Sequence, residues 1–187
     1  GGKFKWDTEK YPGMKDFKKF GPFAYTAKLR NGLFRNPGAC LSPQNAFYNS
    51  IGMETFGLRM ERVCDNAKTL AQFFATEYSD IEVNYPGLAG SKWHNIATEQ
   101  FGDKFGGIIT IRTGNKKRAF GIIDALKLPL IVSNIGDTKT LVIHPESTLN
   151  VHSTQEEKET AGVFDDLIRI SVGIEDIDDL IDDFKQA

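Results

Sequence analysis

The chain has 187 residues, of which 40% are hydrophobic and 26% charged, so it can fill the core of a full domain and is not intrinsically disordered. Its 23 basic and 25 acidic residues give a formal net charge of -2, and the lack of a basic excess argues against a nucleic-acid partner. The longest apolar runs fall well short of the roughly 20 residues that cross a bilayer, which argues against a membrane protein. Two cysteines, Cys40 and Cys64, are too few for a disulfide framework and indicate a cytoplasmic location.

Residues 1–44 are predicted to be an irregular connector of loop and short helix, because four of the seven prolines and several glycines interrupt them. A segment of this kind is expected to pack against another body of protein. The chain opens with Gly1-Gly2-Lys3, without a Met or a signal peptide. Two interpretations fit this opening: a cloning scar before a complete protein, or the later part of a longer chain.

A long helix is predicted from about Glu54 to Tyr78. Ser42 is a suitable N-cap, with Pro43 at the first helical position of the stretch that leads into it. Apolar residues then recur every three or four positions, which gives the helix one apolar face. These residues are Phe56, Met60, Val63, Ala67, Leu70 and Phe74. We expect this helix to join two domains, residues 1–75 and residues 76–187.

Short strands and helices alternate through the rest of the chain. Strands are predicted at 81–85, 107–112, 128–132, 141–143 and 167–172, with 128–132 buried, and helices at 115–126 and 174–184. This mixture indicates an α+β domain of two layers and roughly 100 residues.

Arg169 is the clearest candidate for a binding residue. Alternation along the strand places Ile168, Ile170 and Val172 on one face and puts Arg169 on the other. An arginine in an apolar strand needs an anion, and its planar fork suits a carboxylate. A ligand carboxylate, a structural ion pair with a nearby acid, and simple exposure all remain compatible with the pattern.

Ser133 and Asn134 form a second candidate, because polar groups directly after a strand often face a ligand. A turn formed by the Asn-Ile-Gly-Asp sequence at 134–137 is the competing explanation. The three histidines, His94, His144 and His152, lack the spacing of metal ligands, so no metal site is predicted.

Several segments, in order along the chain, resemble the O-acetylhomoserine sulfhydrylases, which are members of the Cys/Met-metabolism family of pyridoxal-phosphate enzymes. The segments are Leu41-Ser-Pro-Gln-Asn-Ala46, Glu54-Thr-x-x-Leu-Arg-Met-Glu-Arg62, Leu130–Pro145 and Asp166-Leu-Ile-Arg-Ile-Ser-Val-Gly-Ile-Glu-Asp176. Together they span most of the chain. The resemblance implies the C-terminal part of a fold-type I enzyme: a connector, a long spine helix and a small domain with a mostly antiparallel sheet packed against helices.

The same resemblance implies roles for the candidate residues. Arg169 matches the arginine that binds the substrate α-carboxylate, Asn134 matches a position that helps to hold it, and Ser133 stands beside them. The segment Ser147-Thr-Leu-Asn150 departs from the family pattern, which leaves acyl-group and thiol selectivity open. The lysine that binds pyridoxal phosphate is expected upstream, since Lys3, Lys5, Lys10 and Lys15 lack its sequence context. The chain alone is therefore expected to hold no cofactor and no catalytic residue.

The implied activity of the full-length enzyme is the conversion of O-acetyl-L-homoserine and sulfide, or a small thiol, to L-homocysteine or methionine and acetate. The implied assembly is a homotetramer. A methionine γ-lyase or a cystathionine synthase or lyase is the alternative within the family, and a stand-alone interaction module is the alternative outside it.

Overall fold

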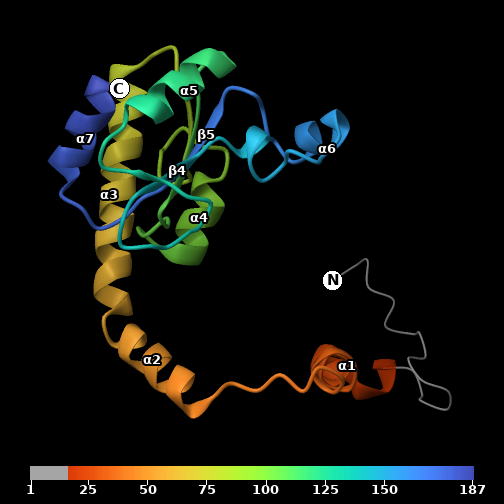
Figure 1. Cartoon of the computed structure of the whole chain (residues 1–187). Helices are drawn as coiled ribbons and strands as arrows, with labels where there is room; N and C mark the ends of the chain where they lie inside the picture. Colours follow the sequence, from red (N-terminus) through yellow and green to blue (C-terminus); the bar gives the residue numbers. More distant parts are fainter. Residues whose placement is uncertain (1–16) are drawn as a thin grey trace. The chain divides into compact units, whose positions relative to one another are not determined.

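The computed structural model describes residues 17–187, and the chain divides into two compact units, Gly1–Ile51 and Gly52–Ala187 (Figure 1). The sequence-based statements about the opening glycines and about Lys3, Lys5, Lys10 and Lys15 fall outside the described residues. The domain boundary predicted between residues 75 and 76 refers to a longer enzyme and stays a prediction.

The described part of the first unit is a succession of short helical segments. A 3-10 helix (η1, Phe17–Phe23) leads into α1 (Ala24–Leu29) and a single π-helical stretch (η2, Arg30–Phe34). Helix α2 (Pro43–Glu54) follows. The Ser42 hydroxyl accepts a hydrogen bond from the Asn45 backbone N–H at 3.2 Å, as an N-cap does, which confirms the predicted start of this helix.

Helix α3 (Phe56–Glu77) is the predicted long helix, and its bounds agree within two residues with the sequence pattern. Thr55, with φ −102° and ψ 5°, separates it from α2. Val63, Ala67, Leu70 and Phe74 are buried along one face, as their spacing predicted. Phe56 is 46% exposed, so the apolar face is covered only from the second turn onward.

The second unit is built on a five-stranded sheet with the order β1-β2-β5-β4-β3. Its strands are β1 (Glu82–Asn84), β2 (Ile108–Arg112), β3 (Leu130–Ile131), β4 (Leu141–Ile143) and β5 (Leu167–Ser171). The pairs β1–β2, β2–β5 and β4–β5 are antiparallel, and β3–β4 is parallel. The expected mostly antiparallel sheet is confirmed, and β5 lies at its centre.

The prediction of a buried strand over residues 128–132 was wrong. The strand is reduced to Leu130 and Ile131, which are 42% and 61% exposed. The run is apolar like that of a buried strand, but β3 lies at the edge of the sheet, where one of its sides has no neighbouring strand to enclose it.

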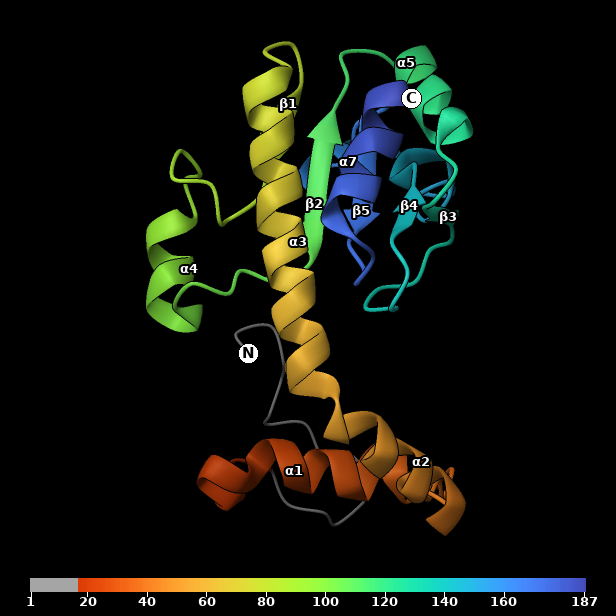
Figure 2. The same ribbon diagram turned by 90° about the vertical axis from the view of Figure 1, so that its left-hand side faces the viewer.

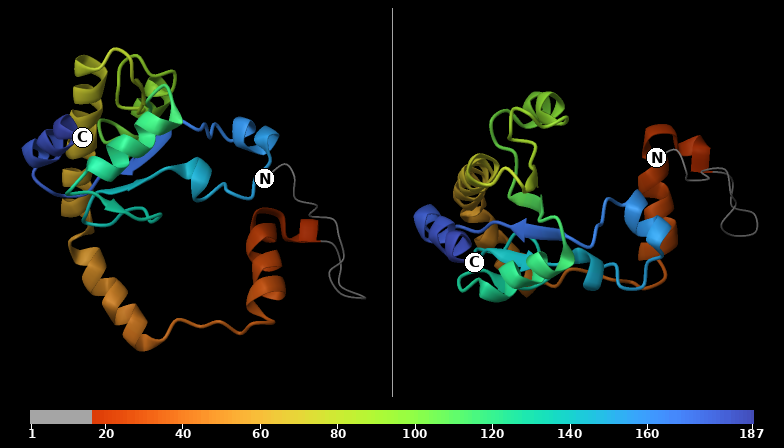
Figure 3. Two further views of the ribbon diagram at one scale, coloured as in Figure 1. Left: turned by 45° about the horizontal axis from the view of Figure 1, so that its top comes forward. Right: turned by 90° about the horizontal axis from the view of Figure 1, so that it is seen from above.

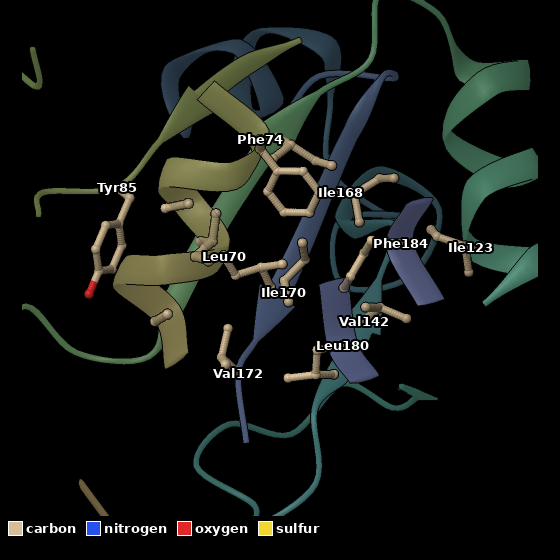
Figure 4. Close-up of a cluster of buried hydrophobic side chains, with 14 of the residues drawn as sticks. Leu70, Phe74, Tyr85, Ile123, Val142, Ile168, Ile170, Val172, Leu180 and Phe184 are labelled. Carbon is tan, nitrogen blue, oxygen red and sulfur yellow. The ribbon is translucent and has the colours of Figure 1, made fainter. Parts of the chain in front are cut away.

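The core lies between one face of the sheet and three helices (Figure 4). Leu70 and Phe74 of α3 face Ile168 and Ile170 of β5. Helix α7 (Ile177–Gln186) adds Leu180 and Phe184, and α5 (Lys116–Ala125) adds Ala119 and Ile123. Burial of a large apolar side chain stabilises a fold by about 1.5–3 kcal/mol, so this cluster fixes which face of β5 is turned inward.

Two further helices belong to this unit. Helix α4 (His94–Phe101) lies on the side of α3 opposite α7 (Figure 2). Helix α6 (Gln155–Thr160) stands apart from the sheet, on the segment between β4 and β5 (Figure 3). A short 3-10 helix, η3 (Pro145–Ser147), precedes it on the same segment. No helix among residues 17–187 is long and apolar enough to cross a membrane.

Candidate carboxylate-binding site

The face of β5 that is turned away from the core carries Leu167, Arg169 and Ser171. Because successive side chains alternate, the burial of Ile168 and Ile170 forces Arg169 to this side. Arg169 is opposite Thr110 of β2 on one side and Ile143 of β4 on the other. The arginine is thus held at the centre of the sheet, on a strand that is hydrogen-bonded along both edges.

The guanidinium of Arg169 contacts the segment that follows β3. Its Nη2 donates to the carbonyl oxygen of Ser133 at 2.8 Å and to that of Asn134 at 3.3 Å. Its Nε is buried and has no hydrogen-bond partner. Burial lowers the pKa of Arg169 from its ordinary value, in the direction expected when a cation loses water. None of the ion pairs among the described residues includes it.

Arg112 shows what a structural arginine looks like on the same face of this sheet. It lies on β2, opposite Leu167. Its Nε donates to Asp166 at 2.9 Å, and its guanidinium carbon is 4.0 Å from the centre of the Phe164 ring. Asp166 is almost fully buried, and its second oxygen accepts from the Gly114 backbone N–H at 3.0 Å. Arg112 is neutralised by an acid of its own fold, whereas Arg169 has only backbone carbonyls.

The structure brings Ser133 and Asn134 to Arg169, but through their backbone. Both side chains are exposed, and the contacts with the guanidinium are made by the two consecutive carbonyl oxygens. The predicted contribution of the Ser133 hydroxyl and the Asn134 carboxamide to ligand binding therefore stays a prediction. The three candidate residues lie together on the side of the sheet that is turned away from the core.

Thr140 and Glu175 belong to this region too, although no motif in the sequence marks them. The Glu175 carboxylate accepts from both the backbone N–H and the hydroxyl of Thr140. Ser171 contacts the same loop, because its hydroxyl accepts a hydrogen bond from the Gly136 N–H at 3.2 Å. Of these three residues, only Ser171 could be placed near Arg169 from the sequence, because it is two residues away and shares the same face of the strand. The contact between Glu175 and Thr140 depends on how the loop folds.

A cavity of about 830 Å³ lies on the same face of the sheet, further toward β1. Asn84, Trp93, Thr110 and Arg112 are among the residues that line it. Arg169 does not line this cavity, and the Arg112 charge is already paired with Asp166. Of the two arginines on this face of the sheet, Arg169 is the one that no described acid neutralises.

Fold and site together describe a small α+β domain with an arginine that no described acid neutralises, on the face of its sheet turned away from the core. The family model for the Cys/Met metabolism PLP-dependent enzymes matches residues 14–187, and the chain belongs to this family.

Three similar proteins illustrate the match. The chain is 38% identical to an O-acetyl-L-homoserine sulfhydrylase of Corynebacterium glutamicum, over 99% of the chain and 46% of the relative. It is 41% identical to an L-methionine gamma-lyase of Fusobacterium nucleatum subsp. polymorphum, over 83% of the chain and 40% of the relative. A Campylobacter jejuni structure assigned as an O-acetylhomoserine (thiol)-lyase, with a pyridoxyl-lysine monophosphate, superposes with a TM-score of 0.79 at 37% identity, over 89% of this chain and 39% of that one. The chain thus spans about half the length of the sulfhydrylase that it matches.

The described residues do not themselves form a pyridoxal phosphate site. A lysine that binds this cofactor covalently lies in a closed pocket, and none of the lysines whose side chains the structure describes is buried. The described lysine Lys158, with 12% side-chain exposure, is paired with Glu146 at 2.6 Å. The described lysines therefore do not fit a covalent cofactor site.

Proposed function

We propose that the protein containing this chain is a pyridoxal-phosphate-dependent O-acetylhomoserine sulfhydrylase. The reaction breaks the bond between Cγ and the acetate oxygen of O-acetyl-L-homoserine and forms a bond from Cγ to sulfur. Sulfide gives L-homocysteine and acetate, and methanethiol gives methionine. Membership of the family and the named sulfhydrylase relatives support this proposal.

The role proposed for this chain is to hold the α-carboxylate of the amino-acid substrate with Arg169. The contrast with Arg112 carries the proposal, because two arginines on one sheet face differ in whether an internal acid neutralises them. An arginine fork can grip both oxygens of a carboxylate, and a buried donor without an acceptor costs about 1–3 kcal/mol. A carboxylate placed against the edge of the guanidinium that includes Nε would supply the missing acceptor.

Asn134 and Ser133 have two proposed functions in this site. Their carbonyl oxygens hold one nitrogen of the guanidinium, which limits the directions in which the rest of the fork can point. Their exposed side chains can then donate to the same substrate carboxylate. Binding one end of the substrate in this way orients its reacting carbon relative to the groups that act on it.

The cofactor is proposed to be held by residues other than those described. Pyridoxal phosphate supplies the electron sink for this class of chemistry, and the protein supplies orientation. The contribution of this chain is to bind and orient the substrate anion.

A methionine γ-lyase is the second candidate, favoured by the relative with 41% identity. Both activities need the same carboxylate contact, so Arg169 does not separate them. Acetate release that depends on added sulfide identifies the sulfhydrylase, whereas release of methanethiol from methionine identifies the lyase. The family match favours either enzyme over a stand-alone interaction module.

The test of the carboxylate contact is substitution of Arg169 in the complete product of the gene. Arg169→Ala should lower kcat/KM about ten- to a hundredfold, because a charge-assisted bidentate contact is worth roughly 1.5–3 kcal/mol. Arg169→Lys should recover only part of this loss, since it keeps the charge but not the fork. Steady-state rates of acetate release measure both effects.

Arg112→Ala is the matched control. It removes an arginine from the same face but leaves Asp166 buried without its partner, so it should lower the thermal midpoint and leave KM for the amino acid near the parent value. The proposal fails if Arg169→Ala unfolds the protein while the folded fraction turns over at the normal rate.

A further inference from the structure

The loop between β3 and β4 is fixed by contacts that converge on Thr140, Gly173 and Glu175. Glu175 Oε1 accepts from the Thr140 backbone N–H at 2.5 Å, and Oε2 accepts from the Thr140 hydroxyl at 2.9 Å. The same hydroxyl accepts from the Gly173 N–H at 2.9 Å. Thr140 is fully buried, so both of its polar groups depend on these partners. We call these three residues the Thr140–Glu175 tie.

Helix α3 also makes hydrogen bonds to two of these residues. The carboxamide of the buried Asn66 donates to the carbonyl oxygens of Gly173, at 3.1 Å, and Glu175, at 2.9 Å. A Cβ at position 173 would lie 2.6 Å from the Lys139 carbonyl carbon, so the loop backbone closes directly onto the glycine. The end of the loop therefore has little freedom relative to β5 and α3.

The other part of the loop reaches Arg169. The Ile174 N–H donates to the Thr138 carbonyl at 2.9 Å, and the Gly136 N–H donates to the Ser171 hydroxyl at 3.2 Å. Two and three residues before Gly136 are Asn134 and Ser133, whose carbonyl oxygens accept from Arg169 Nη2. The carbonyls that hold the guanidinium are thus placed by a loop whose end is fixed by Glu175.

We propose that Thr140 and Glu175 are positioning residues for the carboxylate-binding arginine. They act on the substrate through the loop and Arg169, not by contact. This inference rests on the proposed function, because it assigns the loop a role in holding the arginine that binds the substrate. An arginine side chain has several rotatable bonds. If the guanidinium is not held in place beforehand, part of the binding free energy of the substrate is lost in ordering it.

The experiment compares O-acetyl-L-homoserine with its carboxamide, O-acetyl-L-homoserinamide, in the complete product of the gene. The ratio of the two kcat/KM values measures recognition of the carboxylate alone. Thr140→Val removes the hydroxyl at constant shape, and Glu175→Gln removes the charge at a half-buried position that tolerates the change better. Each should lower the acid-to-amide ratio about three- to tenfold, in the lower part of the range for coupled neighbours.

Two variants serve as controls. Thr140→Ser keeps both the hydroxyl and the backbone N–H, so it should restore the ratio. Thr154→Ala removes the capping box of α6 and should lower the thermal midpoint without changing the ratio. If the ratio fell only because a variant is less stable, Thr154→Ala would lower the ratio too.

The combination with Arg169→Ala separates the two proposals. If the tie acts through Arg169, Thr140→Val or Glu175→Gln should change the acid-to-amide ratio no further in the Arg169→Ala background. A ratio that falls equally in both backgrounds, or in neither, overturns the positioning role and leaves the proposed function intact. A ratio unchanged by Arg169→Ala itself overturns both.

Discussion

Ser133 and Asn134 each offer a backbone carbonyl to Arg169, so replacing either side chain leaves the contact with the guanidinium in place. The two side chains can therefore be tested for a direct role in binding the substrate. Asn134→Ala should raise KM for the amino acid about fivefold or more, because one charge-assisted donor is lost. Ser133→Ala should raise KM by a smaller factor, because a hydroxyl has one donor hydrogen and a carboxamide has two.

Substrate titration of the two variants under identical conditions checks this prediction. Equal KM values for Asn134→Ala and the parent would show that the carboxamide does not touch the substrate. An equal rise in both variants would point instead to a disturbed loop backbone.

At the scale of elements, Glu146 of η3 joins two helices that are distant in sequence. Its carboxylate lies 2.6 Å from Lys158 Nζ of α6 and 2.9 Å from Lys116 Nζ of α5. The hydrogen bonds from Lys158 and Lys116 lower the pKa of Glu146 to about 2. An acid with a lowered folded-state pKa stabilises the fold above its ordinary pKa and loses this contribution as the pH falls toward the folded-state pKa.

Glu146→Gln should therefore be less stable than the parent at neutral pH, and the difference should shrink between about pH 4.5 and pH 2. The pairs are near the surface, so we expect about 1 kcal/mol or less, equivalent to roughly 2–4 °C in Tm. Thermal unfolding at a series of pH values gives the comparison. The exposed Glu156 on α6 provides the control, Glu156→Gln, which should follow the parent at every pH. A difference that persists unchanged to pH 2 would contradict the role of the Glu146 charge.

The elements also show how far sequence reasoning reaches. The spacing of apolar residues in α3 and β5 can be read directly from the sequence. The long helix, and the direction of Arg169 away from the core, could therefore be predicted. The exposure of β3 could not be predicted from the sequence, because it depends on the position of that strand in the sheet. The contact of Glu175 with Thr140 joins residues 35 positions apart and is set by how the loop closes.

At the scale of the whole molecule, we propose that the protein forms homo-oligomers through its apolar surface, as the resemblance to tetrameric enzymes implies. Phe47 and Ile51 lie one helical turn apart on α2 and are 61% and 48% exposed. Exposed apolar groups that gather on one face favour association. Sedimentation velocity over a range of concentrations should show a species larger than one chain.

The double variant Phe47→Ser/Ile51→Ser should shift this equilibrium toward the monomer, whereas Ile131→Ser, on the exposed edge strand β3, should not. A parent protein that sediments as a single chain at the highest concentration would contradict the proposed oligomer.

The position of β5 in the sheet has a consequence for synthesis of the chain on the ribosome. β5 is the central strand, yet it follows the other four strands of the described sheet in chain order. While β1 to β4 leave the exit tunnel, at about 5–20 residues per second, neither β2 nor β4 has its central partner. The apolar side of α3 also stays incompletely covered until Leu180 and Phe184 of α7 have been synthesised. The sheet therefore closes in a late step, and the nascent chain exposes the edges of β2 and β4 until that step is complete.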